Sequence, residues 1–310
     1  MNHEDKVQFN PRSTGAQFSP RSTGVQFNPR STGAQFSPRS TGAQYNPPMR
    51  GAMSRILSVS AKNVLRVVQR NARVWWKYKV PSLVGNLGQP LLFLVAFGFG
   101  LGQQIETIAG YTYLQFIAPG LACSAVMYSA AFEATYGSYT RLSTQSTFEG
   151  ILMTPITVEE LALGEVLWGA LKGLLSGLIM IVVMPLFGLW PSPWVACLPL
   201  LLFVAGILFA ALGLIMTALA TNYDFFNYFV SLIITPLFLF SGIFFAVETL
   251  PAPTMAVVKL MPLTPVVNLA RMFCYGALEP GWPMRVVILI LLASGASWLA
   301  AILLRRRLIK

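Results

Sequence analysis

The chain has 310 residues, of which 55% are hydrophobic and 11% are charged, and its mean hydropathy is +0.62. A soluble domain carries about 25% charged residues, so this composition excludes a water-soluble globular protein of this size. The net charge of +11 would suggest nucleic-acid binding in a soluble protein, but here the Lys and Arg residues lie in blocks beside apolar segments. That pattern is typical of membrane topology, and we expect an all-α integral membrane protein that binds no nucleic acid.

Residues 1–48 contain a nine-residue repeat, which begins with VQFNPRSTG at 7–15 and continues through three further full units. Each unit holds Pro and Gly with few apolar side chains, and such a composition cannot bury a core, so we expect disorder. The alternatives are a basic tail that touches anionic lipid and an extension without function. We also expect natural translation to begin at Met49 or Met53. A mass spectrum of the native protein that begins inside the repeat would contradict this expectation.

Residues 53–79 mix apolar and basic side chains, which predicts an amphipathic helix on the inner membrane surface, within a cytoplasmic segment 49–80. One interpretation is an electrostatic attachment to lipid. The other is a helix that also docks a cytoplasmic partner. Its basic and aromatic candidates are Arg66, Arg70, Arg73, Trp75 and Trp76.

The transmembrane domain covers residues 81–310. Six stretches in it are long and apolar enough to cross a bilayer, which takes about 20 helical residues. Lys and Arg residues cluster before the first stretch and after the last, whereas the 103–114 and 190–194 connections have none. The distribution of basic residues therefore places both termini in the cytoplasm. The six predicted spans are 83–102, 115–136, 165–189, 195–220, 225–247 and 284–304.

The longest cytoplasmic connection, residues 137–163, predicts two helices. The first is short and ends before Pro155, and exposed Phe, Ile and Leu side chains on it would suit insertion into a partner's groove. Thr157 is the predicted N-cap of the second, with two Glu residues in its favourable first turn. The alternative is an ordinary interfacial loop. The candidate docking residues are Phe148, Glu149, Gly150, Ile151, Leu152, Met153 and Thr154.

The outer connection 248–283 is rich in Pro, and its apolar runs are too short to span a bilayer. We expect re-entrant short helices that enter the outer leaflet, because broken backbone at that depth must be packed on protein or face water. At the preceding cytoplasmic turn, Asp224 is the predicted N-cap of the fifth span.

Two charged residues lie within the predicted spans. Glu133 is near the inner end of the second span, and Lys172 is only ~10 Å into the third. A charge at the bilayer centre costs roughly 2.5–3.5 kcal/mol, and neither residue sits there. Lys172 either extends its side chain back to the cytoplasmic surface or pairs with Glu133.

Residue types needed for catalysis or metal binding are sparse. The single His is His3, the three Cys residues are widely spaced, and neither a GxxxxGK[ST] phosphate loop nor an HExxH motif occurs. No nucleophile has a nearby base. The sequence therefore predicts no catalytic residue, no metal, no cofactor and no ATPase site of its own.

Several short stretches carry a family resemblance, and they are PSLVGNLGQPL at 81–91, FGFGLG at 97–102, AFEATY at 131–136, FEGIL at 148–152, LGE at 163–165, SGIFF at 241–245 and MPL at 261–263. Together with the order of elements, they resemble the type-2 permeases of ATP-binding-cassette (ABC) exporters. Within this family they look like the nodulation protein J group, which exports lipo-oligosaccharide. The resemblance covers residues 53–310.

The resemblance implies two permease copies beside two copies of a separate ABC ATPase subunit, in the lipids of the bacterial inner membrane. It makes Phe148–Thr154 the coupling helix to the ATPase, 53–79 the interface helix, and 250–280 a segment that narrows the external exit. The cargo would be an amphiphilic glycolipid, lipo-oligosaccharide or polysaccharide. Alternatives are the export of a drug or small amphiphile, and an ATP-independent secondary transporter. Aromatic residues for stacking on sugar rings, with helix packing as the alternative role, are Tyr128, Tyr136, Phe225, Phe226 and Tyr228.

Overall fold

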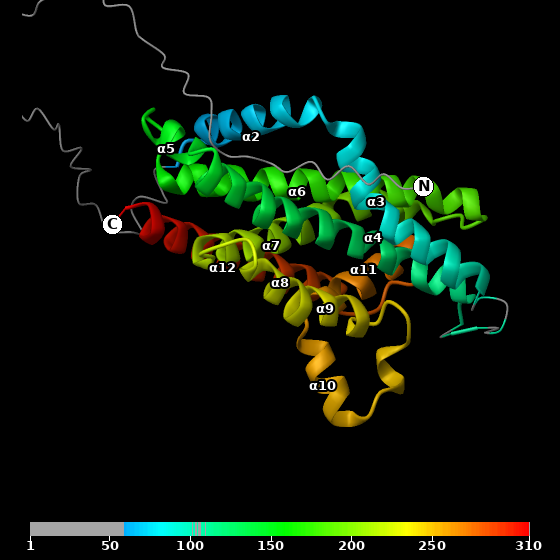
Figure 1. Ribbon diagram of the computed structural model, residues 1–310. Coiled ribbons are helices and arrows are strands. Elements are labelled where there is room, and N and C mark those ends of the chain that lie inside the picture. The colour runs from blue at the N-terminus through cyan, green and yellow to red at the C-terminus, as the bar shows by residue number, and fades with distance from the viewer. Residues whose placement is uncertain (1–58, 101, 103, 105–106, 109, 310) are drawn as a thin grey trace, which may run out of the picture. The chain divides into compact units, whose positions relative to one another are not determined.

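The computed structural model describes residues 59–309, apart from 101, 103, 105, 106 and 109. The predictions for the repeat 1–48 and for a start at Met49 or Met53 lie outside these residues. Within the described part the chain forms helices joined by turns, with one isolated bridge and no strand (Figure 1). The prediction of an all-α protein is confirmed.

The helices follow one another along the chain as α2 (Ala61–Trp76), α3 (Lys79–Val95), α4 (Tyr113–Phe132), α5 (Thr147–Leu152), α6 (Val158–Val183), α7 (Leu198–Leu219), α8 (Phe225–Phe229), α9 (Thr235–Phe240), α10 (Ala252–Leu260), α11 (Leu263–Tyr275) and α12 (Trp282–Leu308). Further helical turns extend α3 to Gly100, α4 to Thr144 and α6 to Phe187, and a π-helical turn joins α8 to α9.

Five described helices are long and apolar enough to cross a membrane, and they match five of the six predicted spans. The exception is the predicted span 225–247. The helix there runs only from Phe225 to Phe240, about 24 Å, because the chain bends at 241–245 around Gly242, whose φ is +78°. The five are Lys79–Gly100, Tyr113–Thr144, Val158–Phe187, Pro193–Leu219 and Trp282–Leu308.

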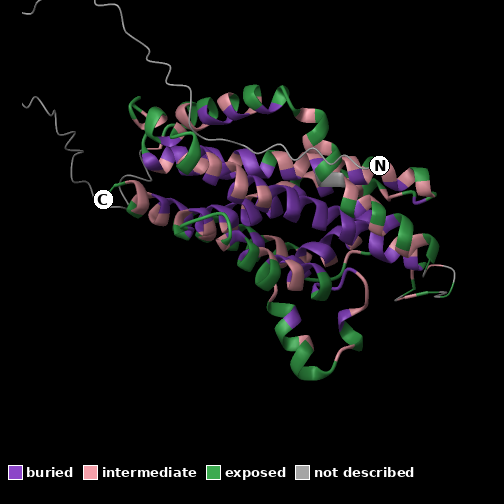
Figure 2. Ribbon diagram, viewed as in Figure 1, coloured by how far each residue is buried: buried purple, intermediate pink, exposed green. Residues whose placement is uncertain are grey.

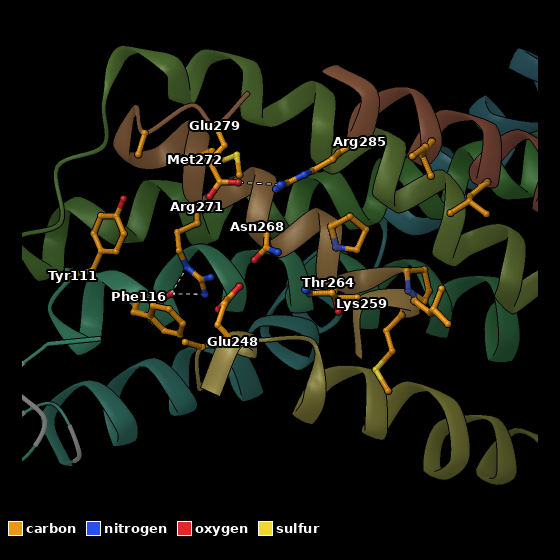
Figure 3. A pocket seen from close by; sticks show the side chains of 18 residues that line it. Tyr111, Phe116, Glu248, Lys259, Thr264, Asn268, Arg271, Met272, Glu279 and Arg285 are labelled. Atoms are coloured by element: carbon orange, nitrogen blue, oxygen red, sulfur yellow. Dashed lines mark hydrogen bonds and ion pairs between the residues drawn. The ribbon is translucent and has the colours of Figure 1, made fainter. Parts of the chain in front are cut away.

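The Pro-rich outer segment folds as α10 and α11, which meet at 83°. α11 buries most of its residues and contacts α4 and α7, whereas α10 is largely exposed (Figures 1 and 2). The two helices and the start of α12 border a cavity of about 910 Å³ (Figure 3). The expectation of short helices in this segment is confirmed, and the number of candidate spans rises to six if the bent pair counts as one.

α4 is the central helix of the bundle and is buried along nearly its whole length (Figure 2). Its many small residues, in the run Ala118–Ala131, let α6 and α7 approach closely, as small side chains do in membrane helix packing. α12 packs against α7 on the other side. The central position of α4 matters because its extension to Thr144 carries the charged residues described below.

Thr157 begins α6, as predicted. Its Oγ1 accepts a hydrogen bond from the Glu160 backbone N–H at 3.2 Å, and a Glu160 carboxylate oxygen accepts one from the Thr157 N–H at 2.9 Å. This reciprocal capping box satisfies two backbone donors at the helix start. The helix then continues without interruption to Phe187, so the predicted cytoplasmic helix and the predicted third span are one element.

Replacing Thr157 with Ala removes the side-chain acceptor of this capping box. We expect the free energy of unfolding to fall by about 1 kcal/mol, the usual contribution of an N-cap side chain. Thermal unfolding in detergent measures the effect. Thr157→Ser keeps the hydroxyl and is expected to unfold like the parent. Equal stability of the Ala variant would show that the cap does not stabilise α6.

Asp224 stands before α8 but does not cap it with its side chain. The Phe225 N–H instead donates to Asn222 Oδ1 at 3.1 Å. The predicted capping role of Asp224 is therefore wrong, because the Phe226 and Asn227 N–H groups, which an N-cap side chain would bind, donate to the Tyr223 and Asp224 carbonyls.

Candidate functional site

α5 lies at the end of the bundle where α12 ends (Figure 1). It follows Ser146, whose φ is +46°, and this is the single described non-glycine residue with a positive φ. A left-handed conformation costs such a residue of order 1–3 kcal/mol and persists only when its surroundings hold it. The turn at Ser146 thus reverses the chain sharply after the α4 extension and sets the position of α5.

The prediction that Phe148 is exposed is wrong, since its side chain is fully buried in the hydrophobic core. Ile151 and Leu152 are half-buried on the same side, because residues three and four apart share one face of a helix. Phe148 therefore fixes α5 to the bundle. The outward surface is formed by the exposed residues Glu149, Gly150, Met153 and Thr154.

One face of α2 packs against α6. Val67 contacts Gly164 so closely that a Cβ on the glycine would lie 2.6 Å from the Val67 Cβ. The Glu160 carboxylate accepts from the Ser60 N–H at 2.8 Å and from Asn63 Nδ2 at 3.0 Å. Protein contacts thus hold α2 in addition to whatever the membrane contributes. Its exposed face carries Arg66, Arg73 and Trp76.

Two π-helical turns extend α4 and carry its charged side chains. Glu133 lies in the first turn and Arg141 in the second. The extra residue in a π-helical turn redirects side chains, and such turns are frequent at functional sites. Gly137 leaves room for the Glu133 carboxylate, because a Cβ at this position would lie 2.8 Å from Glu133 Oε1.

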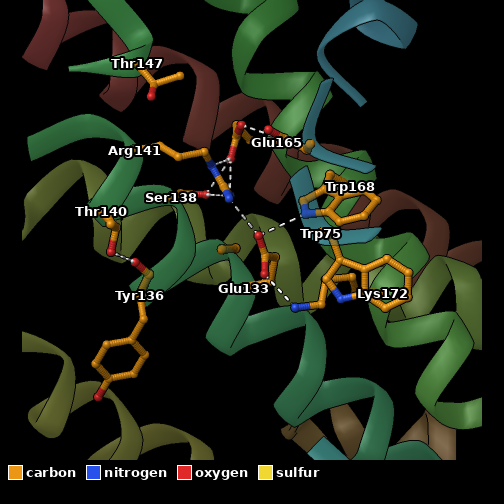
Figure 4. A network of polar contacts seen from close by, with 12 residues as sticks. Trp75, Glu133, Tyr136, Ser138, Thr140, Arg141, Thr147, Glu165, Trp168 and Lys172 are labelled. Carbon is orange, nitrogen blue, oxygen red and sulfur yellow. Dashed lines mark hydrogen bonds and ion pairs between the residues drawn. The ribbon is translucent and has the colours of Figure 1, made fainter. Parts of the chain in front are cut away.

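Four buried charges meet where α4 faces α6 (Figure 4). Arg141 lies between two carboxylates, with Nη1 2.8 Å from Glu133 Oε1 and Nη2 2.7 Å from Glu165 Oε2. Lys172 Nζ lies 2.7 Å from Glu133 Oε2. The charges cancel, which is essential because Glu165 is 0% exposed and an unpaired ion would cost several kcal/mol there.

Neutral groups complete this cluster. Trp168 Nε1 donates to Glu133 at 2.9 Å, and Ser138 Oγ and Asn71 Nδ2 donate to the two oxygens of Glu165 at 2.7 and 2.8 Å. Because Asn71 belongs to α2, three helices share the cluster. We call it the buried charge network, and its members are Asn71, Glu133, Ser138, Arg141, Glu165, Trp168 and Lys172.

Arg70 connects the buried charge network to α5. Its Nη1 donates to Asn71 Oδ1 at 3.0 Å, and its Nη2 donates to Thr147 Oγ1 at 3.3 Å. Burial lowers the pKa of the Arg70 guanidinium, and the positive charge of Arg141 lowers it further. The path from α5 to the centre of the bundle is therefore an unbroken series of hydrogen bonds and ion pairs.

The structure brings together some of the predicted site residues and not others. Arg70, Glu133 and Lys172 meet in or at the buried charge network, and Trp75 packs edge-on against Trp168 with ring centroids 6.1 Å apart. Of the two alternatives for Lys172, pairing with Glu133 is the one observed. Arg66, Arg73 and Trp76 remain on the surface of α2.

Sequence reasoning missed Arg141 and Glu165 as members of the site. A usable signal was present in the chain. Glu133 and Arg141 are eight residues apart on α4, and Glu165 and Lys172 are seven apart on α6, close to two turns in each case. Since α4 and α6 run in opposite directions, each acid faces a base.

The basic C-terminal end of α12 is tied to the same end of the bundle. Arg305 Nη1 lies 2.7 Å from Glu159 Oε1, and Arg307 Nη1 donates to the Thr217 carbonyl at 2.6 Å. Basic side chains commonly bind the last carbonyls of a helix, here those of α7. These residues therefore fasten α12 to α6 and α7.

The sequence model that describes ABC-2 type transporters matches residues 62–275, from α2 to the end of α11. The chain belongs to the ABC-2 type transporter family. Nodulation protein J of Rhizobium meliloti is 34% identical over 254 residues, which cover 81% of this chain and 96% of that protein. Nodulation protein J of Sinorhizobium fredii is 34% identical over 256 residues, covering 82% and 97%. The inner membrane transport permease YadH of Escherichia coli is 26% identical over 227 residues, covering 73% and 86%.

The family resemblance inferred from the short motifs is confirmed. In this ABC-2 chain, α5, the buried charge network and all of α2 after Ala61 lie within the matched residues. Of the aromatic residues considered for sugar stacking, Tyr128 and Phe226 are buried among other rings and serve packing, whereas Tyr228 is exposed.

Proposed function

We propose that this ABC-2 chain is the permease subunit of an ABC exporter in the bacterial inner membrane. It works with two copies of a separate ABC ATPase subunit and with a second permease copy, and both of its termini are cytoplasmic. Family membership, the names of the relatives and the basic residues gathered on α2 and at the end of α12 support this proposal.

The observation that carries the proposal is the continuity between the outward α5 and the helices of the bundle. Thr147 on α5 connects through Arg70 and Asn71 of α2 to Glu165 on α6. Glu165 binds Arg141, which extends the series to α4. A displacement of α5 is therefore transmitted to several helices together and is not absorbed by a flexible loop.

The mechanism follows from this continuity. ATP binding closes the two ATPase subunits on each other, and the exposed face of α5, centred on Met153, is held by one of them. Because Phe148 is embedded in the core, α5 cannot move far without α4 and α6. The helices then rotate as rigid bodies, which is a common form of switching in proteins. A cavity between two permease copies would open and close in response.

The proposed cargo is an amphiphile, namely a glycolipid, a lipo-oligosaccharide or a polysaccharide carried on lipid. Resemblance to the nodulation protein J group supports this class. Its apolar chain would remain in lipid while the head group crosses, and α10 and α11 would narrow the outer exit. A drug or another small amphiphile would use the same path. Transport assays with each class of cargo therefore distinguish these alternatives.

Reconstitution into vesicles tests the proposal. The chain is combined with its proposed ABC ATPase partner and a fluorescent glycolipid, and we expect movement of the glycolipid only when both ATPase and ATP are present. An ATPase with its phosphate-loop Lys replaced is the matched control. Sustained transport by the permease alone, driven by an ion gradient, would contradict the proposal and identify a secondary transporter.

A further inference from the structure

The cavity bordered by α10, α11 and the starts of α4 and α12 lies at the end of the bundle remote from α5. α12 begins beside this cavity and finishes at the other end of the bundle (Figure 1), where Arg305 contacts Glu159. The cavity volume of about 910 Å³ is large enough for a lipid head group and part of an acyl chain. The cavity is therefore separate from the buried charge network.

Arg271 provides a positive charge at the wall of this cavity. Its Nε and Nη2 donate to the Phe116 carbonyl at 3.2 and 3.1 Å, and Nη2 also donates to the Gly242 carbonyl at 2.9 Å. The guanidinium lies over the Phe116 ring at 3.7 Å. These contacts orient the group without neutralising it. Within the described residues Arg271 has no carboxylate at ion-pair distance, whereas Lys172 and Arg305 each have one and Arg141 has two.

The remaining polar groups of the cavity leave its charge positive. Arg285 is paired with Glu279 at 2.9 Å, while Lys259 and Glu248 line the wall without an ion pair among the described residues. Asn268 also faces the cavity, and no hydrogen-bond partner of its side chain occurs in the described part of the chain (Figure 3). Two unpaired cations and a free amide against one unpaired carboxylate favour an anionic, hydrogen-bonding group.

The other wall of the cavity is apolar. Leu292 lies about 15 Å along α12 from its start at Trp282, so the cavity extends well below the polar end of the bundle. An ion without an apolar part would leave this wall unfilled. The apolar lining includes Leu260, Met261, Pro262, Ile288 and Leu292.

We propose that this cavity binds an amphiphile with an anionic head group, a phosphate or a carboxylate. The head group meets Arg271 through the Nη1 donors, which have no partner among the described residues, and Asn268. The apolar chain lies against α12 near Ile288 and Leu292. The chemistry is the same for an anionic membrane phospholipid and for an anionic cargo that has crossed the membrane. Binding requires neither the ATPase nor transport, so a failure here leaves the proposed export function standing.

Native mass spectrometry of the purified full chain in detergent tests the proposal. The probes are lysophosphatidylglycerol, which is anionic with one chain, lysophosphatidylcholine, which has the same chain but no net charge, and inorganic phosphate. We expect saturable retention of the anionic lysolipid, and a loss of about tenfold in its affinity in Arg271→Gln, as for a charge-assisted contact to phosphate. Arg306→Gln, which removes an exposed charge at the other end, is the matched control and is expected to bind normally.

Arg271 also holds two backbone carbonyls, so thermal unfolding must accompany the measurement. If Arg271→Gln unfolds, two other variants test the proposal. Lys259→Gln lowers the positive charge of the cavity, and Ile288→Trp fills the space beside its apolar wall. Both are expected to lower retention of lysophosphatidylglycerol. Equal retention of the two lysolipids, or unchanged retention in these variants, would overturn the proposal. Inorganic phosphate that displaces the lysolipid at equal concentration would overturn the role of the apolar wall.

A competition experiment distinguishes cargo from membrane lipid as the occupant. If a fluorescent anionic glycolipid displaces lysophosphatidylglycerol at a lower concentration than dioleoylphosphatidylglycerol does, the occupant is cargo. The reverse order would identify membrane lipid.

Discussion

Replacing Arg141 with Leu is expected to lower the free energy of unfolding by about 3–5 kcal/mol, the usual cost of removing one partner from a buried ion pair. The change leaves Glu165 and one oxygen of Glu133 without their cation inside the buried charge network. Thermal or denaturant unfolding in detergent measures the loss. We expect export to be lost with it, because the connection between α4 and α6 is broken.

Two further variants separate charge from shape in this experiment. The double variant Arg141→Leu and Glu165→Gln removes one cation and one carboxylate and leaves Glu133 paired with Lys172. It is expected to recover a large part of the stability, since no buried charge is then without a partner. Arg306→Gln, at an exposed position, is expected to change little. A stable Arg141→Leu single variant would show that water reaches Glu133 and Glu165.

Replacing Met153 with Asp is expected to weaken co-purification of the ATPase subunit by at least about tenfold while leaving the permease folded. The side chain is 88% exposed, so the bundle does not depend on it. An apolar side chain at the centre of an interface contributes about 2 kcal/mol or more when it is a principal contact, and a buried unpaired carboxylate would cost further energy. Co-purification and ATP-dependent export are measured together.

Two controls accompany this variant, one at Met153 itself and one at the buried Phe148 of α5. Met153→Leu keeps an apolar side chain and is expected to retain the ATPase. Phe148→Ala is expected to lose about 3–5 kcal/mol of stability through a core cavity, so it reports on the bundle and not on docking. Full retention of the ATPase by Met153→Asp would contradict the assignment of this face of α5 as the docking surface.

The helices of this chain could be predicted well from its sequence, because long apolar runs bounded by basic residues have few alternative folds in a membrane. The N-cap at Thr157 was also predictable, since it depends only on residues three positions apart. The early end of the helix at Phe240 was not, because it depends on a left-handed Gly242 that resembles other glycines in apolar segments.

The candidate site was predicted only in part. Glu133 and Lys172 stood out because they lie inside apolar spans. Glu165 and Arg141 did not, because each lies where the sequence predicted a boundary with water. Their burial depends on α2 covering this end of α6, and no local pattern shows such a contact between segments almost a hundred residues apart. The inward orientation of Phe148 has the same origin.

The alternation of acid and base on α4 and α6 also fixes how these two helices can travel relative to each other. If α6 slid along α4 by two turns, ~11 Å, Lys172 would arrive beside Arg141 and like charges would repel at close range. Tilting about the contact keeps every opposite charge within reach, whereas longitudinal displacement does not. The arrangement of charges therefore allows α4 and α6 to tilt about their contact and opposes sliding of one helix along the other.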